Sequence, residues 1–198
     1  MTAPTPRSDA RRRALAEAAL RVLGREGYAR LTARKVAAEA GLSLGHITYN
    51  FASMDEVLSE AYRHASADLR EATEAALARS GDPMARVSAF LRAGFAEPFL
   101  APAHIRMRVD LWSAALSHPD LAATERDLYD RYRAALLSLL AYLGGPVEKV
   151  EAVADTVMAT LDGLWLDWAR RQNPAALERG LATCEDLIRL RLVPTESA

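Results

Sequence analysis

The chain has 198 residues, of which 51% are hydrophobic, and its formal net charge is −1 at pH 7. This composition supports a buried core and excludes an intrinsically disordered protein. The single cysteine, Cys184, excludes an internal disulfide, and we find neither a signal peptide nor a run of about 18 apolar residues, so we expect a cytoplasmic protein with no membrane partner.

Charge is unevenly distributed along the chain. Residues 1–50 carry nine Lys and Arg against four acidic residues, a balance of +5, whereas the remaining 148 residues carry 16 basic and 22 acidic residues, a balance of −6. A basic N-terminal region suits contact with a polyanion, and the acidic remainder suits another task.

The basic region is predicted to form three helices, over residues 9–24, 33–40 and 44–50. Thr32 and Ser43 precede the second and third of these helices and are favourable N-caps. Gly41 supplies a left-handed turn after the second helix. Because only about three residues separate the second and third helices, the spacing is that of a helix-turn-helix.

The rest of the chain is predicted to be helical as well. Helices are expected over residues 54–80, from Pro83 to about Pro98, from residues 101–103 to about 117, from Pro119 to about Gly144, from Pro146 through Trp168, and from residues 173–176 onward. No segment alternates with the period of two that a half-buried strand requires. The sequence therefore predicts an all-α fold of about nine helices.

Residues 41–45 read GLSLG, which matches the G-x-S-x-G pattern of a hydrolase nucleophile elbow. Such an elbow requires a strand before the serine, and the residues before Ser43 are strong helix formers. No acid-and-histidine arrangement, clustered metal ligands, P-loop or dinucleotide glycine motif accompanies the pattern. We interpret Ser43 as a helix cap and expect no catalytic residue, no metal, no cofactor and no enzyme activity.

Residues 31–58 resemble the DNA-binding region of TetR-type transcriptional regulators. The residues that match the family pattern are Thr32, Val36, Ala37, Ala40, Gly41, Leu42, Ser43, Gly45, Phe51 and Leu58. The resemblance implies a helix-turn-helix domain over residues 1–52 and a ligand-sensing, dimerising domain over residues 53–198. It further implies a homodimeric repressor that leaves a palindromic operator in double-stranded DNA when a small molecule binds.

The third helix is then the recognition helix. Ile47 and Phe51 are apolar and four residues apart, so both are expected to point inward. The predicted DNA-contacting residues are Thr32, Arg34, Lys35, Ser43, Leu44, His46, Thr48 and Tyr49, with further cations from Arg11 to Arg13. A solvated surface is the alternative role for Arg34 and Lys35.

The chain departs from the family pattern at three positions. Thr48 and Asn50 flank Tyr49 where many members have Tyr-x-His, and Met54 stands where a lysine is common. We expect these differences to change operator choice and to weaken contacts with phosphate, and we do not expect them to change the fold.

Long apolar stripes in the last two helices match the dimerising helices of the family. The residues assigned to a dimer interface are Val157, Leu161, Leu164, Trp168, Leu177, Leu181, Cys184 and Ile188. Burial inside a single chain is the alternative for these stripes.

Residues 111–122, LWSAALSHPDLA, and 161–169, LDGLWLDWA, are similar to BetI-type regulators, which control choline-to-betaine genes. The resemblance implies a quaternary ammonium effector held by aromatic ring faces and a carboxylate. The candidate residues are Asp110, Trp112, Tyr129, Tyr132, Asp162 and Trp165. Regulators of other molecules share LDGLW, so other small apolar or aromatic effectors stay open, as do an activator, a helical adaptor without DNA binding and a helical enzyme.

Overall fold

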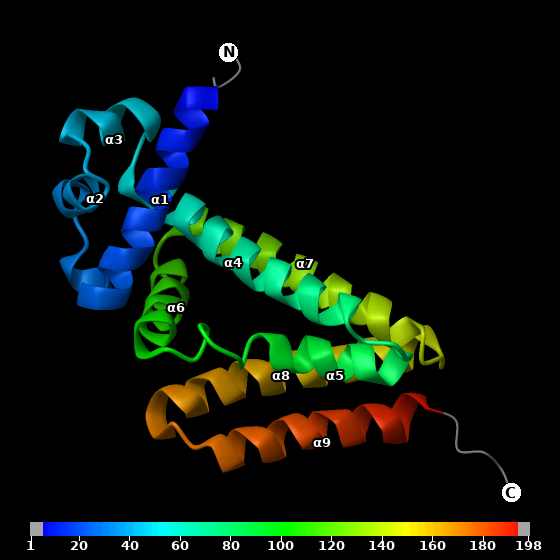
Figure 1. Ribbon diagram of the computed structural model, residues 1–198. Coiled ribbons are helices and arrows are strands. Elements are labelled where there is room, and N and C mark those ends of the chain that lie inside the picture. Colours follow the sequence, from blue (N-terminus) through cyan, green and yellow to red (C-terminus); the bar gives the residue numbers. More distant parts are fainter. Residues whose placement is uncertain (1–5, 194–198) are drawn as a thin grey trace, which may run out of the picture. The chain divides into compact units, whose positions relative to one another are not determined.

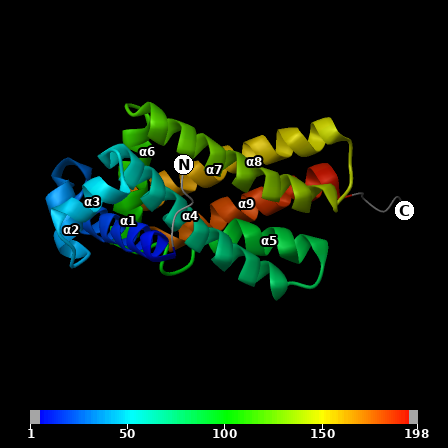
Figure 2. The same cartoon turned by 90° about the horizontal axis from the view of Figure 1, so that it is seen from above.

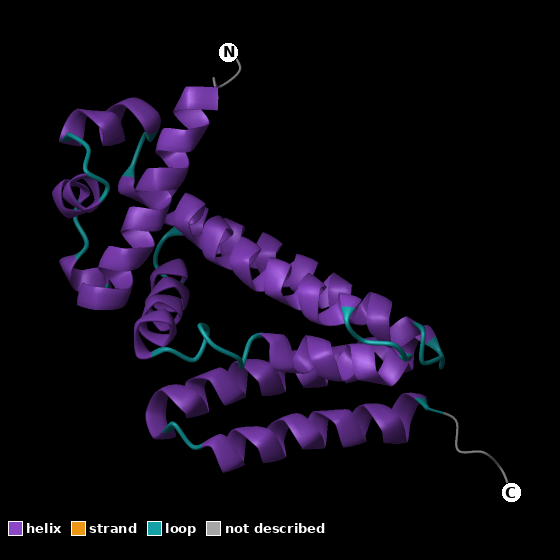
Figure 3. Ribbon diagram, in the orientation of Figure 1, coloured by secondary structure: helices purple, strands orange, loops and turns teal. Residues whose placement is uncertain are grey.

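The structure is a computed structural model that describes residues 6–193, and those residues form helices joined by short turns (Figures 1 and 3). The helices are α1 (Pro6–Glu26), the short 3-10 helix η1 (Tyr28–Arg30), α2 (Ala33–Glu39), α3 (Leu44–Asn50), α4 (Met54–Ala78), α5 (Pro83–Ala93), α6 (Pro102–Ala115), α7 (Pro119–Ala141), α8 (Val147–Arg171) and α9 (Pro174–Leu192). No strand occurs between residues 6 and 193, and the expected all-α fold is confirmed. None of these helices is long and apolar enough to cross a membrane.

Local sequence signals position most helix ends. The side chains of Thr32, Asp82 and Asn173 each accept a hydrogen bond from the backbone N–H three residues later, which satisfies donors that a first helical turn leaves unpaired. Two details were not predicted. Helix η1 follows α1, and α5 ends at Ala93 instead of near Pro98, with Gly94 as its C-cap.

The chain divides into two compact units. The N-terminal unit comprises the described part of Met1–Asp68 together with Ala101–Leu128, and the C-terminal unit comprises Leu69–Leu100 together with the described part of Tyr129–Ala198. Two of the three dividing points lie inside α4 and α7, so each of these helices contributes residues to both units, and the third lies between α5 and α6. The expected boundary between a DNA-binding and a ligand-sensing domain, after residue 52, does not coincide with the boundaries of these compact units. That functional boundary stays a prediction.

The N-terminal unit has two apolar clusters. One joins α1, α2, α3 and the start of α4, and it contains Leu15, Val36 and Ile47. The other joins α1, α4, α6 and the start of α7, and it contains Leu23 and Leu111, both fully buried. Helix α1 contributes to both clusters and therefore supports the helix-turn-helix from one side and α6 from another.

The C-terminal unit is built around one large apolar cluster of α5, α7, α8 and α9, in which α8 and α9 lie side by side (Figures 1 and 2). Six residues assigned to a dimer interface are buried in this cluster within the single chain: Val157, Leu161, Leu177, Leu181, Cys184 and Ile188. Side chains that are at most 9% exposed in the single chain offer little surface to a second copy, and their part in a dimer interface stays a prediction. Helical periodicity marks an apolar face without indicating what covers it.

The other two assigned residues are partly buried against the same cluster. Leu164 lies so close to Gly180 of α9 that a β-carbon there would overlap it, which explains a glycine at the α8–α9 contact. The indole N–H of Trp168 donates to the carbonyl of Leu100 at 3.3 Å. Both side chains are therefore used within the chain.

Candidate nucleic-acid interface and effector site

Apolar side chains hold the inner face of α3. Ile47 and Phe51 are each 4% exposed and pack in the cluster that α3 shares with α1 and α2, which confirms their predicted inward orientation. Gly41 forms the turn between α2 and α3 at φ +67°, a conformation that other residues rarely adopt. The turn and the two anchors fix which side of α3 faces outward.

The outer face of α3 is accessible. Leu44 is 45% exposed and Tyr49 is 82% exposed, while Thr48 is exposed and His46 is half-buried. The hydroxyl of Thr48 donates to the carbonyl of Gly45 at 3.2 Å, so its hydrogen is already used within the helix. The four outward residues predicted on α3 thus remain candidates for DNA contact.

Ser43 occupies the N-cap position of α3, as predicted, but its side chain does not cap the helix. Its Oγ lies 2.9 Å from Nδ1 of His46 instead. The predicted position of Ser43 at the start of α3 was right, and the predicted capping hydrogen bond was wrong. The hydroxyl is hydrogen-bonded to the imidazole of His46 and does not accept from a backbone N–H.

The predicted cations on α2 are not equivalent. Thr32 and Arg34 are exposed. The ammonium of Lys35 lies 2.6 Å from Oε2 of Glu26, and this hydrogen bond is the largest cause of the lowered pKa of Glu26. Arg34 therefore offers its charge to a partner more readily than Lys35, which is paired with Glu26.

Of the three N-terminal arginines, Arg12 makes contacts within the unit. Arg12 lies 4.2 Å from the centre of the Phe51 ring, donates to the carbonyl of Asn50, and pairs with Glu56 at 2.9 Å. The pKa of Glu56 is lowered, first by the backbone N–H of Ala52 and also by Arg12. Arg12 thus joins the end of α3 to the start of α4, and its expected contact with DNA stays a prediction.

Asn50 also lies inside the unit. It is 8% exposed, its Nδ2 donates to the carbonyl of His46 at 2.7 Å, and its Oδ1 accepts from Ser8 at 3.2 Å. This departure from the family pattern therefore acts on the position of α3 and not by direct contact with DNA. Met54 is partly buried against the same cluster.

A polar chain that sequence reasoning missed connects η1 with α4 and α6. The hydroxyl of Tyr28 lies 2.7 Å from Nε2 of His118, and Nδ1 of the same imidazole lies 3.2 Å from Oδ2 of Asp55. The backbone N–H of Tyr28 donates to Asp110 at 2.8 Å. These partners are up to 90 residues apart, so no local pattern could have paired them.

The candidate effector residues fall into two groups. Asp110 and Trp112 belong to the N-terminal unit, where Asp110 binds Tyr28 and the guanidinium of Arg108 lies 5.2 Å from the centre of the Trp112 ring. The other four, Tyr129, Tyr132, Asp162 and Trp165, belong to the C-terminal unit. The structure thus gives Asp110 and Trp112 other partners, and their role as effector contacts stays a prediction.

Aromatic rings gather in the C-terminal unit. Tyr132 stacks on Phe90 with ring centres 4.5 Å apart, and Trp165 lies 5.4 Å from Phe95 in a tilted arrangement. Trp165 is 5% exposed, and Asp162 lies three residues before it on α8. Residues three apart share a helix face, so a carboxylate and an indole of the predicted set are neighbours.

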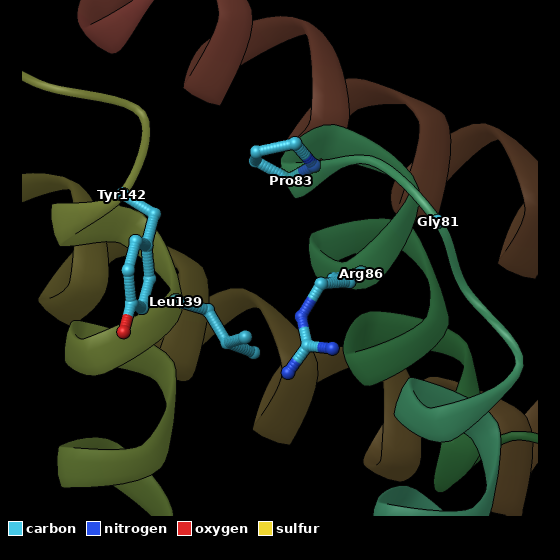
Figure 4. A pocket seen from close by; sticks show the side chains of 5 residues that line it. All are labelled: Gly81, Pro83, Arg86, Leu139 and Tyr142. Carbon is cyan, nitrogen blue, oxygen red and sulfur yellow. The ribbon is translucent and has the colours of Figure 1, made fainter.

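A pocket of about 280 Å³ also opens in this unit (Figure 4). Its lining consists of Gly81, Pro83, Arg86, Leu139 and Tyr142. None of the candidate effector residues lines it, and Tyr142 at its edge is 80% exposed. The pocket is thus separate from the aromatic group around Trp165.

Two family models match the chain. The model for bacterial regulatory proteins of the tetR family matches residues 15–61, and the model for the C-terminal domain of BetI-type transcriptional repressors matches residues 83–193. The chain belongs to the TetR family and is of the BetI type. This TetR-family chain is a helix-turn-helix transcriptional regulator, and its relatives are regulators and not enzymes.

Individual proteins agree with this assignment of a BetI-type regulator. The chain is 30% identical to the HTH-type transcriptional regulator BetI of Rhizobium meliloti over 182 residues, which cover 92% of this chain and 89% of that protein. A transcriptional regulator from Rhodococcus sp. Rha1 has a similar structure, with a TM-score of 0.80, 26% identity, and coverage of 92% and 99%. The fold is also shared by a regulator from Saccharomonospora viridis crystallised with choline, with a TM-score of 0.76, 21% identity, and coverage of 94% and 100%.

Proposed function

We propose that this regulator is a homodimeric repressor whose residues 1–52 bind a palindromic operator and whose residues 53–198 release it when a small molecule binds. The observation that carries the proposal is the outer face of α3, where exposed Leu44, Thr48 and Tyr49 stand on a helix anchored by buried Ile47. Exposed Thr32 and Arg34 on the α2 side supply contacts to phosphate.

The test is binding of the purified protein to DNA from upstream of its own gene, measured by fluorescence anisotropy across a salt series. We expect sequence-selective binding that weakens as salt increases, because phosphate contacts release counterions. Arg34→Ala should weaken binding to all sequences alike and should reduce the salt slope by about one. Binding of upstream and random DNA with equal affinity, for this segment and for sequences selected from a random library, contradicts the proposal.

For the homodimer, the exposed face of α8 supports a contact with a second copy. Small side chains recur on it at helical spacing, and the residues are Ala152, Thr156, Ala159 and Gly163. Small residues allow two helices to approach closely, so we expect Ala159→Arg to give monomers in light scattering after size exclusion. Ala75→Arg, at an exposed position of α4, serves as the matched control and should stay dimeric.

For the effector, the aromatic residues of the C-terminal unit support a choline-like cation. A quaternary ammonium is attracted to the face of an indole by about 0.5–2 kcal/mol, and Trp165 and Asp162 offer a ring and a carboxylate on one helix. A protein of the same fold from Saccharomonospora viridis was crystallised with choline. Tyr129 and Tyr132 are further candidates in the same unit.

Titration calorimetry with choline tests the effector proposal. We expect binding that Asp162→Asn weakens about tenfold, because the neutral amide keeps the shape and loses the charge. Bound choline should also lower operator affinity, since an effector acts only through different affinities for two states. Operator affinity that is unchanged at saturating choline rejects choline as the effector and leaves DNA binding intact.

A further inference from the structure

The recognition helix α3 has an unusual composition for reading bases. Its seven residues, LGHITYN, include no Lys, Arg, Asp or Glu. The commonest specific contact with DNA, an arginine or lysine on guanine, therefore cannot come from α3. Base recognition by this helix falls to methyl groups, one phenol and one imidazole.

Leu44 and Thr48 present apolar groups on one side of α3. They are four residues apart, so they share a helix face, and both are exposed. The hydroxyl hydrogen of Thr48 is used by the carbonyl of Gly45, so Thr48 cannot donate to a base and presents its methyl and an acceptor oxygen. In the major groove, the apolar feature that such groups recognise is the 5-methyl of thymine.

His46 has one ring nitrogen that is hydrogen-bonded within the chain. Its Nδ1 is 2.9 Å from Oγ of Ser43, and that hydroxyl caps no backbone N–H. When the hydroxyl donates to Nδ1, the ring proton lies on Nε2, because one ring nitrogen sets the tautomer of the other. Nε2 is then a donor, and purine N7 is an acceptor that faces the major groove.

We propose that α3 reads a half-site in which thymine methyl groups meet Leu44 and Thr48 and a purine N7 accepts a hydrogen bond from Nε2 of His46, with Ser43 as the residue that positions this imidazole. This inference rests on the proposed function, because it names the class of operator that the same helix binds. It requires sequence recognition by α3 without a charged side chain.

The experiment begins with in vitro selection of binding sequences from random DNA by the full-length protein. The selected half-site is then altered one atom group at a time. Replacement of a contacted thymine by deoxyuridine removes the methyl and should weaken binding about threefold to fivefold. Replacement of the contacted purine by its 7-deaza analogue removes one acceptor and should weaken binding about fivefold to tenfold.

Protein variants link each effect to a side chain. Thr48→Ser keeps the hydroxyl and loses the methyl, so deoxyuridine at the thymine that Thr48 contacts should cost nothing further in this variant, while the thymine that Leu44 contacts should stay sensitive. His46→Ala should remove the sensitivity to 7-deazapurine, Ser43→Ala should reduce it, and Ser43→Thr should restore it. Arg34→Ala is the control, because loss of a phosphate contact lowers affinity and leaves sensitivity to both analogues unchanged.

The two possible failures can be told apart. If no sequence is selected over random DNA, the proposed function fails. If a sequence is selected and bound tightly, but deoxyuridine and 7-deazapurine are tolerated at every position of the half-site, this inference is overturned and the regulator stands. Deoxyuridine sensitivity that Thr48→Ser leaves unchanged at every thymine, or 7-deazapurine sensitivity that persists in His46→Ala, also overturns it.

Discussion

Different interactions stabilise the interior of each of the two units. In the N-terminal unit two smaller apolar clusters are supplemented by hydrogen bonds and ion pairs that join separate helices, such as Tyr28 to His118 and Arg12 to Glu56. In the C-terminal unit one large cluster joins four helices, and fewer polar links are needed inside it: Arg92 pairs with exposed Glu178, and Ser88 and Arg92 contact the buried carboxylate of Glu185.

This difference suits two tasks. Apolar burial supplies most of the free energy of folding but has no direction, whereas a hydrogen bond contributes only about 0.5–1.5 kcal/mol and fixes distance and angle. A DNA-reading helix must be held in one orientation, and polar links to α3 and η1 provide that. Substitutions in the C-terminal unit should therefore unfold the protein, and substitutions of polar links in the N-terminal unit should mainly impair DNA binding.

The largest expected effect is in the C-terminal core. Phe90 is fully buried and stacks on Tyr132, so Phe90→Ala should lower the free energy of unfolding by about 3–5 kcal/mol. Urea denaturation at fixed protein concentration measures this. Val147→Ala, at a position that is 69% exposed, should change stability by less than about 0.5 kcal/mol. Equal effects of the two substitutions would contradict the view that the buried core of the C-terminal unit supplies most of the stability.

The next largest expected effect is a pH dependence of stability caused by His104 in the N-terminal unit. Burial, and then the nearby charge of Arg108, lowers the pKa of His104 from 6.5 to about 4. Between these two pH values His104 binds a proton in the unfolded chain but not in the folded chain. The contribution of neutral His104 to stability is therefore complete above pH 6.5 and is lost as the pH falls to about 4. After allowance for partial solvent screening, we expect this protonation to lower the free energy of unfolding by about 2 kcal/mol.

Denaturation of wild type and His104→Asn at several pH values tests this contribution. The variant cannot take up the proton, so its stability should fall less between pH 6.5 and pH 4. Carboxylates with lowered pKa values, such as Glu26 and Glu56, lose their contribution in acid in both proteins and cancel in the difference. Parallel pH profiles contradict the prediction.

Arg12 and Arg13 test the role of polar links directly. Arg12 contacts Phe51, Asn50 and Glu56, whereas Arg13 pairs with Glu17 on the same helix and its side chain is 70% exposed. Arg12→Ala should cost about 1–2 kcal/mol of stability and lower operator affinity more than tenfold, because α3 loses its link to α4. Arg13→Ala should cost less than about 0.5 kcal/mol. If Arg12→Ala leaves operator affinity unchanged, the link that Arg12 makes between α3 and α4 is not needed for DNA recognition.

The smallest effect is expected at Tyr28. Tyr28→Phe removes the hydroxyl that lies 2.7 Å from His118 and should cost about 0.5–1.5 kcal/mol. Hydrogen exchange of η1 and α2 amides should increase in the variant, since the link between η1 and the turn that joins α6 to α7 is lost. Tyr142→Phe, at a position that is 80% exposed, should leave both stability and exchange unchanged.

Local signals in the sequence determined the helices and the class of regulator. Thr32, Asp82 and Asn173 cap helices through backbone groups three residues away, and the inward pair Ile47 and Phe51 follows from helical spacing alone. The basic N-terminal region and its helix-turn-helix pattern pointed to DNA without any tertiary information.

Only the tertiary structure decided how the side chains are used. Periodicity marked Val157 and Ile188 as apolar-face residues, but their burial in one chain depends on four helices packing together. Charge marked Arg12 and Lys35 as cations, but their partners Glu56 and Glu26 come from other helices. A sequence pattern specifies the few residues nearest in the chain, whereas burial and pairing depend on residues that folding alone brings together.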